Sequence, residues 1–69
     1  MINVSNDIKE ALDLWLSNNK HHNEDELLDL HMYQIIELFE RGIGYENEFS
    51  PLNTLSLMDM AKVLLFGYK

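Results

Sequence analysis

The chain has 69 residues, no cysteine and a formal charge of −7, from five basic and twelve acidic side chains. This length allows one small domain with a small core, and the lack of cysteine excludes disulfides, thiol chemistry and thiolate metal sites. The negative charge disfavours direct binding to nucleic-acid phosphates or to anionic membranes.

Residues 5–18 are predicted to form the first helix. The Ser5 hydroxyl can cap its start, and apolar residues recur at the three-and-four spacing of one helical face. That face contains Ile8, Ala11, Leu12, Trp15 and Leu16. The segment lacks the basic region and cleavage site of a signal peptide, and no 18-residue apolar window occurs in the chain, so we expect a cytoplasmic protein.

Residues 24–41 are predicted to form the second helix, with Asn23 and Glu26 as a capping box and Gly42 as the end signal. Its apolar stripe consists of Leu27, Leu28, His31, Met32, Ile35, Leu38 and Phe39. Because His31 lies within that stripe, we expect a neutral core or interface histidine with a satisfied hydrogen bond, which would tie stability to pH.

Residues 43–53 lack a period and contain a glycine and the only proline, which predicts an irregular connection. Four apolar side chains can pack beneath it: Ile43, Tyr45, Phe49 and Leu52. The third helix is predicted over residues 55–67, with Ser56 as a cap. The fold expected is therefore all-α, a compact three-helix bundle with an irregular packed loop between helices two and three, in a single domain spanning residues 1–69.

The third helix is apolar on two opposite sides. Its predicted core face contains Leu57, Met60, Ala61, Leu64 and Tyr68. The opposite side contains Leu55, Val63 and Phe66. Because two other short helices can hardly cover both sides, we expect a homodimer through helix three or a partner protein there.

The second helix adds candidate contact residues. Leu30 and Tyr33 lie opposite its apolar stripe, and with Leu55, Val63 and Phe66 they form the predicted partner-binding set. Residues 24–48 contain eight acids against the single base Arg41. The predicted electrostatic steering groups are Asp29, Glu37 and Glu40, which favour a basic protein partner.

Residues with catalytic or metal-binding chemistry have structural interpretations. His21, His22 and Glu24 offer metal ligands, but adjacent histidines in a loop point in different directions, so a solvated loop is favoured over a metal site. The serines and threonine occupy helix ends or loops, where capping accounts for them. We expect no catalytic residue, no cofactor and no enzyme activity.

The segment LSLMDMAKVLLFGYK resembles helical segments of small uncharacterised accessory proteins from Gram-positive phages and integrated elements. The matching positions are Leu57, Asp59, Met60, Ala61, Lys62, Leu64, Gly67 and Tyr68. The resemblance covers less than a quarter of the chain and implies an accessory protein that acts through protein contacts, with no catalytic residues to transfer.

The function predicted from the sequence is that of a small acidic interaction or regulatory protein, acting by occupying a partner's surface. An alternative is a nucleic-acid mimic, whose carboxylates replace phosphates and block a DNA-binding protein. A third, less favoured interpretation is a metal-binding protein that uses the histidines and carboxylates near residue 22.

Overall fold

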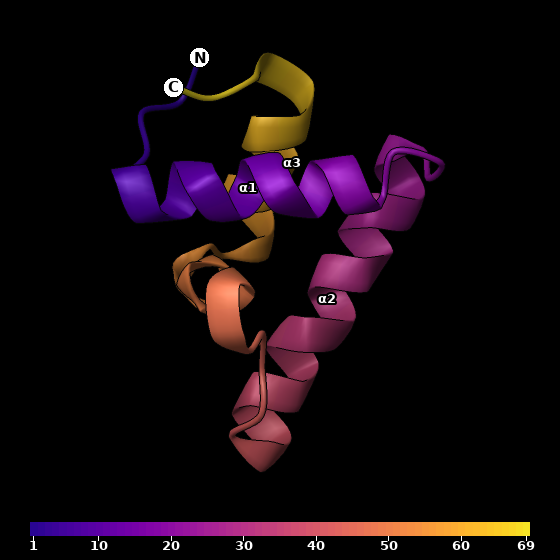
Figure 1. Ribbon diagram of the computed structural model, residues 1–69. Helices are drawn as coiled ribbons and strands as arrows, with labels where there is room; N and C mark the ends of the chain where they lie inside the picture. The colour runs from indigo at the N-terminus through magenta and orange to yellow at the C-terminus, as the bar shows by residue number, and fades with distance from the viewer.

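The computed structural model describes residues 1–69 and contains four helical segments (Figure 1). The α-helices are α1 (Asn6–Asn18), α2 (Glu24–Arg41) and α3 (Leu57–Phe66), and a 3-10 helix, η1 (Asn47–Thr54), precedes α3. The all-α class is confirmed, and the three α-helices lie within two residues of their predicted bounds. The three-helix bundle is not confirmed, because η1 occupies most of the segment predicted to be irregular.

The helices begin at the capping residues that the sequence signals indicated. The Ser5 hydroxyl accepts a hydrogen bond from the Ile8 amide at 3.4 Å, and the Ser56 hydroxyl accepts one from Asp59 at 3.0 Å. Asn23 and Glu26 form the reciprocal capping box. Each cap satisfies amides that the first helical turn leaves unpaired, so these helix starts are determined locally.

The packing of the helices explains why this is not a simple bundle. α1 packs against η1, whereas α2 packs against α3. Figure 1 shows α1 lying across the molecule, while α2 runs away from it so that its second half projects beyond α1. The radius of gyration is 11.1 Å, about the value expected for a compact chain of this length.

The core is assembled from all parts of the chain. Its buried apolar members are Ala11, Leu12, Trp15, Leu27, Tyr45, Leu52, Leu55, Met60 and Val63. Tyr45 and Leu52 confirm that the connection between α2 and α3 is packed. α2 contributes only Leu27 and the polar His31 to the buried set, both from its first half.

Two predicted partner-binding residues, Leu55 and Val63, lie in the core with exposed fractions of 5% and 3%. Val63 is three residues after Met60, so both project from the same face of α3. Leu57, predicted as core, is 41% exposed. The buried face of α3 is therefore turned from Leu57 towards Val63, which corrects the predicted orientation of this helix.

The two chain ends are paired, which the sequence analysis did not predict. The Ile2 amide donates to the Gly67 carbonyl and the Lys69 amide donates to the Ile2 carbonyl, at 3.1 and 3.0 Å. Gly67 has φ 81° and ψ 178°, a conformation that is essentially restricted to glycine. The Tyr68 hydroxyl donates a hydrogen bond to the Asp13 carboxylate on α1. These contacts fix the end of α3 beside α1.

Candidate functional site

Large apolar side chains are exposed mainly on α2 and α3. Phe39 on α2 is 84% exposed, and Met58 and Leu65 on α3 are 66% and 64% exposed. Single exposed apolar residues are common on protein surfaces, so their grouping decides whether they form a site.

An apolar groove lies between α2 and α3. It has a volume of about 380 Å³, and its lining residues are Leu28, Asp29, Met32, Leu57, Met58 and Ala61. The other surface hollows are lined mostly by polar side chains. The α2–α3 groove is therefore the one hollow whose chemistry suits an apolar ligand surface.

The apolar surface continues beyond the groove along α2. Ile36 follows Met32 by four residues and Phe39 follows Ile36 by three, so all three share one side of the helix. Ile36 is 41% exposed and Phe39 is 84% exposed. We call Ile36 and Phe39 the apolar extension of the groove. On α3, Leu65 shares the groove side because it follows Ala61 by four residues.

Carboxylates border this surface on the α2 side. Asp25, Asp29 and Glu40 follow one line along α2, since about 100° of rotation per residue brings them to within 60° of one another. None of the three makes an ion pair in the structure, whereas the predicted steering residue Glu37 pairs with Arg41 at 3.7 Å. We call Asp25, Asp29 and Glu40 the acidic edge.

The remaining predicted partner-binding residues do not join the groove. Leu30 is 36% exposed but lies two residues from both Leu28 and Met32, on the opposite side of α2. Tyr33, 64% exposed, follows Asp29 by four residues, so it lies beside the acidic edge and about 100° around α2 from Met32. Phe66, 66% exposed, projects from the side of α3 opposite Leu57. With Leu55 and Val63 in the core, the predicted set does not form one surface.

The groove was missed because its α2 residues belong to the stripe that the sequence analysis assigned to the core. That stripe has seven members, yet only Leu27 and His31 are buried. A stripe this wide on the longest helix of so small a chain was the available signal, since the chain has too few elements to cover it.

His31 is fully buried and links three segments. Its Nε2 lies 2.8 Å from the Leu55 carbonyl oxygen, and its Nδ1 lies 2.7 Å from the Tyr45 hydroxyl. A carbonyl only accepts, so we assign the ring proton to Nε2 and let Tyr45 donate to Nδ1. The prediction of a satisfied core histidine is confirmed.

Burial lowers the pKa of His31 below its ordinary value. Hydrogen bonding to the backbone at Leu55 and Ser56 raises the pKa, but by less than burial lowers it. Burial likewise raises the pKa of the Tyr45 hydroxyl. Both side chains are therefore neutral near pH 7. With both ring nitrogens occupied and no exposed surface, His31 serves as a structural connection between α2 and the start of α3.

Tyr45 is positioned by Asn53 and by the aromatic ring of Trp15. The Asn53 side chain accepts from the Tyr45 amide at 2.7 Å and donates to the Tyr45 carbonyl at 3.0 Å. The preceding Gly44 leaves room for this clamp, because a Cβ there would lie 2.2 Å from the Asn53 oxygen. The Trp15 and Tyr45 rings meet edge to face at 6.2 Å.

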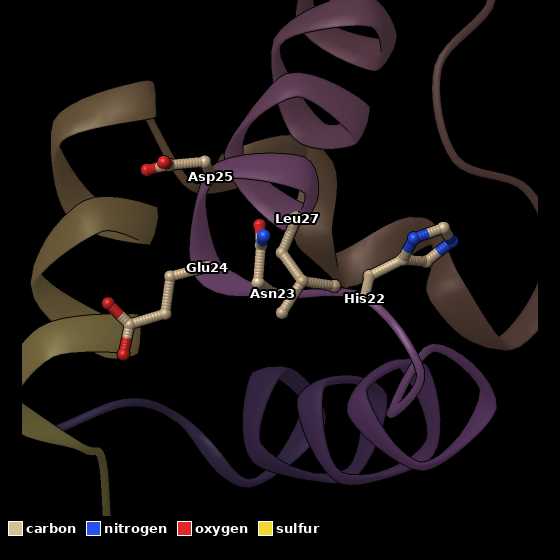
Figure 2. A pocket seen from close by; sticks show the side chains of 5 residues that line it. All are labelled: His22, Asn23, Glu24, Asp25 and Leu27. Atoms are coloured by element: carbon tan, nitrogen blue, oxygen red, sulfur yellow. The ribbon is translucent and has the colours of Figure 1, made fainter.

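The loop before α2 holds the residues considered for a metal site. Figure 2 shows the Glu24 and Asp25 carboxylates pointing to one side and the His22 ring pointing to the other. The His22 Nδ1 lies 3.6 Å from a Glu26 carboxylate oxygen. No three histidine or carboxylate side chains in the structure are grouped closely enough to hold a metal ion together.

None of the helices combines the length and the apolar character that crossing a membrane requires. The chain matches no protein-family model, no curated protein and no solved structure. The functional inferences below therefore rest on the geometry of the groove, its apolar extension and the acidic edge.

Proposed function

We propose that this protein is a small, non-enzymatic interaction protein that binds a partner protein through the α2–α3 groove. The observation that carries the proposal is the apolar groove itself, with its exposed Met58 and its continuation to the exposed Phe39. Exposed apolar surface of this kind gains free energy when a partner covers it.

Three of the hydroxyl groups that could act as nucleophiles, and the buried histidine, have structural roles. Ser5 and Ser56 cap helices, and the Thr54 hydroxyl donates to the Pro51 carbonyl at 2.8 Å. His31 has no exposed surface. These engagements support a binding role over a catalytic one.

The proposal includes a cytoplasmic, phage-type accessory role, in which the protein modulates a partner by occupying its surface. Nucleic-acid mimicry is less favoured, because a phosphate mimic requires an uninterrupted strip of carboxylates. Here Ile36 and Phe39, both exposed, lie beside the acids on α2.

Photo-crosslinking from single surface positions tests the proposal in the cells that naturally contain the protein. A benzoylphenylalanine at Leu65, beside the groove, should give a defined crosslinked protein, whereas the same group at Phe66, on the side of α3 opposite Leu57, should not. Leu65 and Phe66 are exposed to nearly the same extent, 64% and 66%, so access to solvent is matched. The Leu65 crosslink should disappear in Met58→Gln. Identical crosslinks from both positions, or none that depend on Met58, would contradict the proposal.

Self-association through α3 is the other way in which this surface becomes covered. Light scattering over a dilution series distinguishes it, because a monomer has a mass of 8.1 kDa at every concentration. A larger mass that falls to the monomer value in Leu65→Gln would show that a second copy is the partner.

A further inference from the structure

We infer that the groove and its apolar extension take one amphipathic helix of a partner protein, whose basic residues lie along the flank that faces the acidic edge. This inference rests on the proposed function and names the chemistry of the partner. It follows from the shape of the apolar surface, from the charges that border it and from the charges that a second copy would bring.

The shape suits a helix. The apolar surface on α2 runs from Leu28 to Phe39, which at 1.5 Å per residue is about 16 Å, or three helical turns. Met58 and Ala61 of α3 line the groove beside the first part of this line, and Leu65 continues that side of α3 by one turn. A partner helix laid along it would insert apolar residues spaced three and four apart. Met32 and Met58 have flexible side chains that adapt to such residues.

The border charges are asymmetric. On the α2 side, the acidic edge presents three carboxylates without ion-pair partners. On the α3 side, the outer residues are Met58 and Leu65, with Lys62 as the neighbouring charge. A helix with lysine or arginine along one flank would pair with the acidic edge while its other flank meets apolar side chains.

A second copy of this chain fits less well. Each copy has a net charge of −7, and the same surface would meet itself in a two-fold dimer. Lys62 is the single cation beside that surface, so it would face the carboxylates of Asp25, Asp29 and Glu40 from each copy. Like charges brought together in this way oppose association.

Calorimetric titration with two model peptides tests the inference. Both are 18-residue amidated helices with one leucine stripe; one has lysines along a single flank, and the other has glutamines at those positions. We expect the lysine peptide to bind at least tenfold more tightly at low ionic strength, and the difference to shrink as salt screens the charges. Asp29→Asn with Glu40→Gln should remove most of the difference. Glu10→Gln with Asp7→Asn, which removes two carboxylates from α1, should retain it.

The apolar part of the site is tested separately. Met58→Gln and Leu65→Gln change exposed residues without changing charge, and unaltered circular dichroism would show that the fold is intact. Each should weaken both peptides by tenfold or more. Lysine-peptide binding that survives both changes would show attraction by charge alone and overturn the inference, as would the absence of binding by either peptide.

Two results separate this inference from the proposed function. Equal binding of both peptides, with no effect of the Asp29 and Glu40 changes, overturns the basic partner but leaves binding in the groove. A native dimer that dissociates in Leu65→Gln replaces the partner helix by a second copy. A Leu65 crosslink that does not depend on Met58, by contrast, defeats the proposed function itself.

Discussion

α1 and α2 are both amphipathic helices with hydrogen-bonded N-terminal caps, yet the rest of the chain covers them to different extents. α1 has 13 residues and buries three of them: Ala11, Leu12 and Trp15. α2 has 18 residues and buries only Leu27 and His31, both in its first half. Its second half exposes Ile36 and Phe39.

This difference shows that an apolar stripe identifies the side of a helix that can be buried. How much of that side is buried depends on the other elements that pack against it. α1 lies against η1 and the core formed around Leu52 and Met60. The second half of α2 extends beyond α3 in Figure 1, and there Ile36 and Phe39 remain exposed. We expect four measurements to sharpen or break this comparison.

The largest effect should come from matched apolar deletions on the two helices. Leu12→Ala removes a side chain with no exposed surface and should lower the free energy of unfolding by about 2–5 kcal/mol, through lost burial and a cavity. Phe39→Ala, at an 84% exposed position, should change it by less than about 0.5 kcal/mol. Urea unfolding followed by circular dichroism measures both. Equal losses would show that Phe39 is covered by the chain and that α2 is not open.

Glycines beyond the ends of α3 and α2 provide the next comparison. Gly67, at φ 81° and ψ 178°, should resist alanine more strongly than Gly42, at φ 70° and ψ 16°. Gly67→Ala should lower the free energy of unfolding by an amount towards the upper end of about 1–3 kcal/mol. Gly42→Ala should lower it by about 1–2 kcal/mol.

Amide exchange shows where the Gly67 effect acts. The Lys69 amide, bonded to the Ile2 carbonyl at 3.0 Å, should lose protection in Gly67→Ala and retain it in Gly42→Ala. Unchanged protection of Lys69 in Gly67→Ala would mean that the pairing of the chain ends does not depend on this glycine.

The pH dependence of stability should report on the buried half of α2. Because the pKa of His31 is lowered in the folded state, the unfolded chain takes up a proton first as the pH falls. The stabilising contribution is therefore complete above about pH 6.5 and is lost as the pH falls towards the folded pKa, by at most about 1.4 kcal/mol per pH unit.

His31→Gln keeps a polar side chain but cannot titrate. The free energy of unfolding of this variant is compared with that of the wild type between pH 7.5 and 5, from about one unit above to about one and a half units below the ordinary histidine pKa. The difference between the two curves isolates the contribution of His31. His21 and His22 remain in both proteins. Parallel curves would show that His31 is not the source of the pH dependence.

The smallest effect concerns the contact between α1 and the chain end. Burial, together with the bond to Asp13, raises the pKa of Tyr68 to about 12. Ultraviolet titration should therefore lose a high-pH tyrosine transition in Tyr68→Phe. The stability cost at pH 7 should be about 0.5–1.5 kcal/mol, the usual value of one hydrogen bond. Loss of a transition at about pH 10, the ordinary value for tyrosine, would show that Tyr68 is not held by Asp13.

Prediction from the sequence succeeded where local chemistry decides the outcome. The caps at Ser5, Asn23 and Ser56 and the left-handed end at Gly42 are set by residues within a few positions of one another. The burial of His31 followed from its place in an apolar stripe. Its partners, Tyr45 and Leu55, lie 14 and 24 residues away and were not predicted.

The prediction of the site was less successful, because exposure depends on which elements meet. On α3, both Leu57 and Val63 are apolar and either side was available for burial. The packing of α2 and the core selected Val63 and left Leu57 lining the groove. The residues of the groove were all in predicted helices, but their grouping required the α2–α3 contact.

The sequence by itself determined that the chain is helical, where its α-helices begin and end, and that its surface is strongly acidic, because propensity, capping and charge act within one or two turns. Only the tertiary structure decided that the connection winds into η1, that the chain ends pair, and that α2 keeps an open apolar side next to α3. Those features depend on contacts between distant segments, and each contact decides which of several suitable surfaces is covered.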